Sequence, residues 1–173
     1  VNNIEDNNEM DFTRTIHSLY FIFSDNIKKV HYQLGLRGEY TYRNIKNEQS
    51  PDAYIINRID MFPTIHISHQ FPNDHQLMAR YSRRINRPRG RYLDPFPNYP
   101  NTYNIRIGNP DLQPEYIDSY ELGYQKMIKS SFISVEAYYR ITNYKITRIR
   151  TLHGKDVMMI TFENLDKDYA LGT

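Results

Sequence analysis

The sequence predicts an all-β protein, built as an antiparallel meander of about seven long strands. Apolar and polar residues alternate with a period of two over long stretches, and turn residues separate these stretches. No window repeats apolar residues convincingly at the spacing of a helix. The 16 tyrosines agree with this prediction because tyrosine favours strands. The chain has no cysteine, which excludes a disulfide framework and thiolate metal sites.

The clearest strand lies at residues 30–43. Leu34, Leu36 and Tyr40 fall on one face of this segment, and Arg37 and Glu39 fall on the other. The segment is longer than a typical strand of about 5–6 residues. By the same reasoning we expect strands at 11–24, 30–43, 54–71, 76–87, 117–128, 131–150 and 157–173.

The connections between these strands are expected to differ at the two edges of the sheet. Short connections are predicted at 25–29, 72–75 and 129–131, and long ones at 44–53 and 88–116. The two kinds alternate along the chain, as in transmembrane barrels, which have short turns at one rim and long loops at the other. The last connection, 152–156, is short and departs from this pattern.

Two architectures fit alternating strands: a section of a transmembrane β-barrel, or a soluble secreted β-sandwich acting as an adhesion or carbohydrate-binding module. The mean hydropathy of −0.73 and the lack of any apolar run of about 18 residues exclude a membrane-spanning helix. Strand length and the unequal edges favour the barrel. In a barrel one set of residues faces lipid and another faces a polar lumen, whereas a sandwich packs the first set into a core. The first set is Leu34, Leu36, Leu122 and Val135, and the second is Arg37, Glu39 and Glu136.

Four ordered motifs carry a resemblance to a known family. They are YSRRINRP at 81–88, LDPF at 93–96, GNPDLQPE at 108–115 and YELGY at 120–124. Together they resemble the outer-membrane β-barrel of TonB-dependent receptors, and the first two resemble the barrels of gut and oral anaerobes and their relatives. Asn164 and Gly172 resemble the strand after the next loop. The residues that match the family motif are Arg84, Arg87, Pro88, Pro95, Phe96, Gly108, Asn109, Pro110, Leu112, Pro114, Glu115, Glu121 and Gly123.

This resemblance implies a function in transport. Such receptors build a 22-stranded barrel with an N-terminal plug in the outer membrane of a Gram-negative bacterium. They import a scarce nutrient of the siderophore, cobalamin or glycan type with energy from TonB. We expect residues 1–173 to be a partial barrel domain without plug or signal peptide, contacting the lipid bilayer. Alone, it should self-associate through its unpaired edge strands.

The proline-rich motif at 108–115 has a structural explanation of its own. Pro110 and Pro114 hold the chain extended and lack amide donors. Gly108 is expected to adopt a backbone angle that a β-carbon would forbid. Glu115 is expected to pair with a nearby arginine. We interpret the motif as an anchor that ends a long loop and sets the register of the next strand.

Other chemistries are less well supported. Six arginines between Arg80 and Arg91 suggest nucleic acid, but alternation places Arg80 and Arg84 in the lumen and Arg83 near the outer rim, so we expect no nucleic-acid partner. The histidines lie in different elements, or on opposite faces like His66 and His69, so we expect no metal site.

No catalytic motif or cofactor-binding motif is recognisable, and we expect the protein not to be an enzyme. Tyr92, Tyr99 and Tyr103 in the long loop either stack on a sugar or aromatic ligand or stiffen the loop. We favour the second interpretation.

Overall fold

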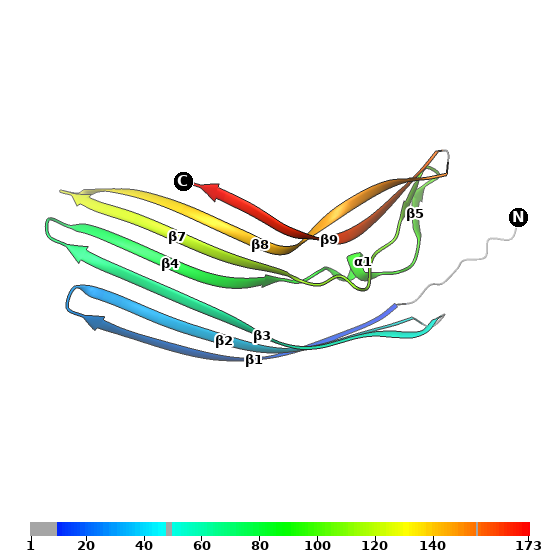
Figure 1. Cartoon of the computed structure of the whole chain (residues 1–173), viewed down its shortest axis with the longest axis horizontal. Helices are drawn as coiled ribbons and strands as arrows, with labels where there is room; N and C mark the ends of the chain where they lie inside the picture. Colours follow the sequence, from blue (N-terminus) through cyan, green and yellow to red (C-terminus); the bar gives the residue numbers. More distant parts are fainter. Residues whose placement is uncertain (1–9, 48–49, 155) are drawn as a thin grey trace, which may run out of the picture.

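The computed structural model describes residues 10–47, 50–154 and 156–173, and these form one strongly curved sheet (Figure 1). Within these ranges the sheet has nine strands in the order β1-β2-β3-β4-β7-β8-β9-β6-β5. Seven are long: β1 (Met10–Ile27), β2 (Val30–Asn47), β3 (Ser50–Phe71), β4 (His75–Asn86), β7 (Glu115–Ile128), β8 (Ser131–His153) and β9 (Val157–Gly172). No helix among the described residues has the length and apolar character needed to cross a membrane. The seven long antiparallel strands predicted from the sequence are therefore confirmed.

The expected long connection at 44–53 is wrong. Strand β2 continues to Asn47 and β3 begins at Ser50, so the two strands form one extended hairpin. The physical reason is that Ile45 and Tyr54 are register partners on the same face, and Ile45 is almost fully buried there. The alternation therefore continues beyond the point where polar composition suggested a loop.

The short connections lie together at the ends of the long strands that are opposite the β2–β3 hairpin (Figure 1). Four residues in these turns have a left-handed backbone: Lys28, Asn73, Asp74 and Lys129. Tight hairpins need such residues because a positive φ matches the twist of the flanking strands. This edge of the sheet is as predicted.

The segment between β4 and β7 contains three short elements that the sequence did not predict. They are α1 (Gly90–Leu93), β5 (Asn98–Asn101) and β6 (Asn104–Arg106). Strand β6 pairs in parallel with β9, so the sheet is not a pure meander. Elements of three or four residues are too short to show a periodicity. Strand β6 depends instead on pairing with β9, which the bond from the Ile107 amide to the Ile160 carbonyl extends, and β5 pairs in turn with β6.

The two faces of the sheet differ as a barrel wall requires. Leu34, Leu122 and Val135 are 43%, 55% and 56% exposed on the outward face, whereas Glu39 is 7% exposed on the inward face. Among the described residues no second layer covers the outward apolar face, and α1 lies inside the curve of the sheet (Figure 1). The alternative of a soluble sandwich is therefore wrong.

The exposed apolar residues of the outward face form a band. A row of tyrosines lies at the limit of this band that is nearer the long loops. Tyr81, Tyr120, Tyr139 and Tyr169 lie on adjacent strands, with ring centroids 5.1, 6.4 and 6.4 Å apart in that order. Beyond this row, toward the long loops, charged and amide side chains enter the outward face: Arg83, Asp118, Asn143 and Lys167. Tyrosines at such a boundary are typical of the interface between lipid and water. The position of Arg83 near the outer rim agrees with the prediction.

We predict that a charge in the middle of the outward band destabilises the protein and that the same charge beyond the band does not. In the full-length protein refolded into lipid vesicles, Val135→Arg is expected to lower the free energy of unfolding by about 2–4 kcal/mol. The control, Asn143→Arg, also faces outward but lies beyond the tyrosine row, and should cost about 0–1 kcal/mol. Equal effects of the two variants in urea titrations would contradict the assignment of the band.

Candidate functional site

The segment 87–114 folds onto the inward face of the sheet near its long-loop edge. Leu93 of α1 and Leu112 of the GNPDLQPE motif are fully buried and pack with Ile45 of β2. Partly buried hydrophobic side chains from both arms of the curved sheet complete this cluster, which we call the loop core: Met10, Phe12, Tyr54, Tyr92, Ile146 and Phe162. The loop core therefore joins β1–β3 to β8–β9 through a segment that lies between them.

Arg43 of β2 holds the far end of this segment. Its guanidinium donates to the carbonyl of Pro110 at 2.9 Å and to that of Leu112 at 3.4 Å. Arg43 lies beyond the apolar band, on the inward face. Burial is the largest cause of the lowered pKa of Arg43, followed by the charges of Arg58 and Arg14. The pKa of an arginine begins so high that the group remains charged. The two carbonyls therefore receive charge-assisted hydrogen bonds.

Arg87 holds the beginning of the segment. It pairs with Glu39 and donates to the Thr41 hydroxyl at 3.2 Å, and Arg37 contacts the other oxygen of Glu39 at 3.2 Å. Glu39 and Thr41 are buried on the inward face of β2. The chain after β4 is thereby drawn across the interior toward β2.

Glu115 makes different contacts from those expected. Its carboxylate accepts hydrogen bonds from the Asn86 side chain at 2.6 Å and from the Ile146 amide at 2.8 Å. The expected arginine partner is wrong because Asn86 is the register partner of Glu115, while Arg87 turns away toward Glu39. Glu115 thus ties the start of β7 to both β4 and β8.

Asn164 fastens the same motif to β9. Its carbonyl oxygen accepts the Gln113 amide at 2.9 Å, and its amide nitrogen donates to the carbonyls of Gln113 at 3.0 Å and Tyr144 at 2.7 Å. Asn109 adds a bond to the Phe162 carbonyl at 3.1 Å. The resemblance pointed to Asn164 and Asn109 without giving their roles, and the structure brings them together around the loop.

Gly108 is needed for a different reason from the one expected. It is not among the residues with a left-handed backbone, so the expectation of a forbidden backbone angle is wrong. An added β-carbon would lie 2.5 Å from the Asp94 carbonyl oxygen and 2.7 Å from that of Tyr92. The two arms of the segment meet here, because the Gly108 and Asn109 amides donate to these same two carbonyls. Glycine allows this close approach of two backbones.

The remaining motif residues are more dispersed. Pro88 and Pro114 are buried, Pro95 is partly buried in the segment, and Arg84 faces inward from β4. Glu121 lies 3.9 Å from Arg80 across the pair β4–β7, and Gly123 is covered by Met78. Arg84, Glu121 and Gly123 therefore belong to the barrel wall, whereas the three prolines belong to the infolded segment.

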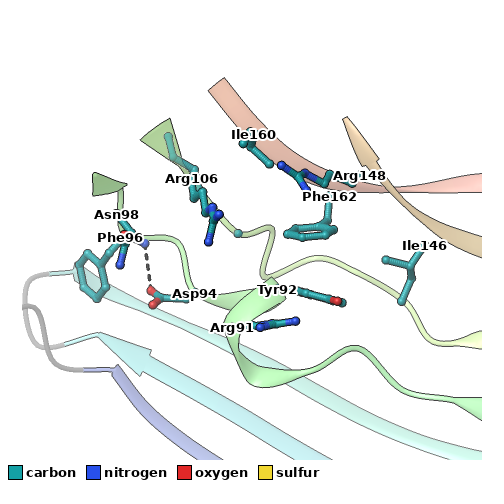
Figure 2. A pocket seen from close by; sticks show the side chains of 12 residues that line it. Arg91, Tyr92, Asp94, Phe96, Asn98, Arg106, Ile146, Arg148, Ile160 and Phe162 are labelled. Atoms are coloured by element: carbon teal, nitrogen blue, oxygen red, sulfur yellow. Dashed lines mark hydrogen bonds between the residues drawn. The ribbon is translucent and has the colours of Figure 1, made fainter. Parts of the chain in front are cut away.

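A cavity of about 630 Å³ lies between the segment 90–108 and the inward faces of β8 and β9 (Figure 2). One wall contains the Tyr92 ring stacked on the Phe162 ring, with centroids 4.0 Å apart and planes at 23°. Arg91, Arg106 and Arg148 surround the space in Figure 2. The volume lies within the range of about 300–1,000 Å³ that is usual for small-molecule sites. The cavity is the candidate functional site. Its arginines could not be predicted as a group from the sequence, although Tyr92 in its wall is one of the loop tyrosines considered for ligand stacking.

The loop tyrosines divide between the two interpretations. Tyr92 stiffens the loop by stacking on Phe162, whereas Tyr99 and Tyr103 are 68% and 67% exposed. His66 and His69 face opposite sides of β3, and within the described ranges no three His, Cys, Asp or Glu residues are grouped so as to hold a metal ion.

We predict that the loop core determines the local stability of the segment 87–114. Leu112→Ala should cost about 2–5 kcal/mol and speed hydrogen exchange of the amides at 107–113, because it removes a fully buried side chain. Leu152→Ala is the matched control, since Leu152 is 67% exposed near the end of β8. Unchanged exchange in Leu112→Ala, measured by mass spectrometry on the full-length protein, would show that the core does not hold the segment.

The comparisons with known proteins agree with this geometry. The structure resembles the Serratia marcescens hemophore receptor HasR, solved as a double mutant with its hemophore HasA and heme (TM-score 0.71, 14% identity, 92% of this chain and 31% of that chain). It also resembles the siderophore receptor PirA of Pseudomonas aeruginosa (TM-score 0.59, 12% identity, 95% of this chain and 39% of that chain). A search of curated protein sequences gave no match.

The chain thus spans about a third of each of the two receptors. Their fold, together with a family model that covers every residue, confirms the resemblance drawn from the motifs at 81–124. Because the model of the outer membrane protein beta-barrel family matches residues 1–173, the chain belongs to that family and resides in the outer membrane of a Gram-negative bacterium.

Proposed function

We propose that the chain is part of an outer-membrane receptor that imports a scarce nutrient by a TonB-dependent route. The observation that carries the proposal is the infolded segment 87–114, which lies inside the curve of the sheet where a ligand entering the barrel must pass. Arg43, Arg87 and Asn164 fasten the segment across the interior, so it keeps a fixed position beside the path of the ligand.

Other parts of the full-length receptor are expected to close the barrel, fill it and contact TonB. Residues 1–173 are a partial barrel domain, further strands close the barrel, and a plug domain fills it and contacts TonB. A wall section with a loop-lined cavity supports binding and transport, and we assign no catalytic, cofactor-binding or metal-binding residue. The proposed ligand is a siderophore, a cobalamin or a glycan. The ligands named for the two similar receptors, heme and a siderophore, make iron carriers the first class to test.

Uptake by cells tests this function. Labelled hemin, a ferric siderophore, cobalamin and an oligosaccharide are supplied separately to the parent strain, to a strain lacking the gene for this protein, and to one lacking TonB. We expect uptake of one of these compounds to fall at least about tenfold in both deletion strains, because transport needs both the receptor and its energy source. Restoring the gene should restore uptake. Unchanged uptake of all four, or loss only in the gene deletion, would contradict a TonB-dependent receptor.

We also predict that the isolated chain does not behave as a dilute monomer. Among the described residues, strand β1 is paired on one side only over Met10–Ile27, and the outward face is broadly apolar. Free strand edges and large apolar patches promote association. Sedimentation of the chain in plain buffer should show oligomers or aggregate, and detergent should reduce them. A stable monomer without detergent would contradict the assignment of the outward face to lipid.

A further inference from the structure

Three arginines from separate elements surround the cavity. Arg91 comes from α1, Arg106 from β6 and Arg148 from β8, so residues far apart in the sequence are brought around one space (Figure 2). Asp94 is the one acidic residue in the cavity wall, and its carboxylate accepts the Phe96 amide at 3.1 Å. The described wall of the cavity therefore carries a net positive charge.

Several other arginines of the inward face are paired with acids: Arg37 and Arg87 contact Glu39, Arg58 contacts Asp60 at 3.1 Å, and Arg80 lies 3.9 Å from Glu121. Arg43 and Arg140 contact neutral oxygens instead. Among the described residues, Arg91, Arg106 and Arg148 form no such ion pair. Three cations held around one space repel each other, and an anion between them removes that repulsion.

The rest of the cavity wall is mostly apolar and partly planar. The stacked rings of Tyr92 and Phe162 line the space together with Phe96 and Ile160. Flat aromatic surfaces favour a planar partner. The cavity wall thus contains both three arginines and a pair of stacked aromatic rings.

We propose that this cavity binds a small organic polyanion with a planar apolar body. The proposal rests on the proposed receptor function and names the ligand class. Guanidinium groups bind carboxylate, sulfonate or phosphate oxygens through paired hydrogen bonds, so two or three acidic groups would each find a partner. The cavity lies on the inward face, farther toward the long loops than the tyrosine row, so its occupant enters through the barrel and is not a lipid headgroup.

The test measures binding of pyranine, a planar pyrene trisulfonate, to the full-length receptor in detergent by fluorescence anisotropy. Arg91→Gln, Arg106→Gln and Arg148→Gln should each weaken binding about tenfold, as expected for loss of one charge-assisted contact. Arg140→Gln is the matched control, because Arg140 also faces the lumen but lies outside the cavity, near Ser119. It should change the dissociation constant less than about twofold. The uncharged analogue 1-pyrenemethanol should bind wild type and the three cavity variants equally.

Two outcomes would overturn the proposal: no binding of pyranine to the wild-type receptor, or equal weakening by Arg140→Gln, which would indicate a general positive lumen and no defined site. These results are separate from the uptake experiment, because binding in detergent needs neither TonB nor energy. Normal binding with no uptake would refute the transport function alone. TonB-dependent uptake with unaltered binding in all three variants would refute the cavity alone.

Discussion

The contact between Leu93, Leu112 and Ile45 is the interaction on which the interior of this protein depends. A single curved sheet with a polar inward face offers little apolar surface to bury there. The infolded segment supplies that surface, and the loop core it forms lies between the two arms of the sheet. The hydrogen bonds of Arg43, Glu115 and Asn164 then fix the segment in one position, because buried polar groups need partners.

The outward face follows a different constraint. Its leucines, isoleucines and tyrosines are exposed in the described chain, which would be unfavourable in water but suits a hydrocarbon environment. The row of tyrosines at its upper limit places the loop core and the cavity beyond the membrane, on the side of the long loops. The fold therefore positions a rigid, cationic cavity at the entrance of the barrel. Apolar and polar residues alternate along each strand. This alternation creates the apolar outward face and the polar inward face, and its polar half lowers the mean hydropathy of the chain.

The long strands could be predicted because their period of two extends over many residues, as in the segment 30–43. The loop elements could not, since α1 and β6 have only three or four residues each and form through contacts with β9. Glu115 and Gly108 show the same limit. The sequence indicated that both are structurally important, but their partners, Ile146 and Asp94, are set by tertiary packing. The cavity was missed for this reason too, because its arginines come from three separate elements.

The most direct test of this account is the structure of the full-length receptor in a lipid nanodisc, determined by electron cryomicroscopy. The account predicts ordered density for residues 87–114 inside the barrel wall, with Leu112 against Ile45 and Asn164 bonded to Gln113. The outward residues Leu122 and Val135 should contact the lipid belt. A segment 87–114 that projects away from the barrel, leaving Ile45 exposed to the lumen, would contradict the account.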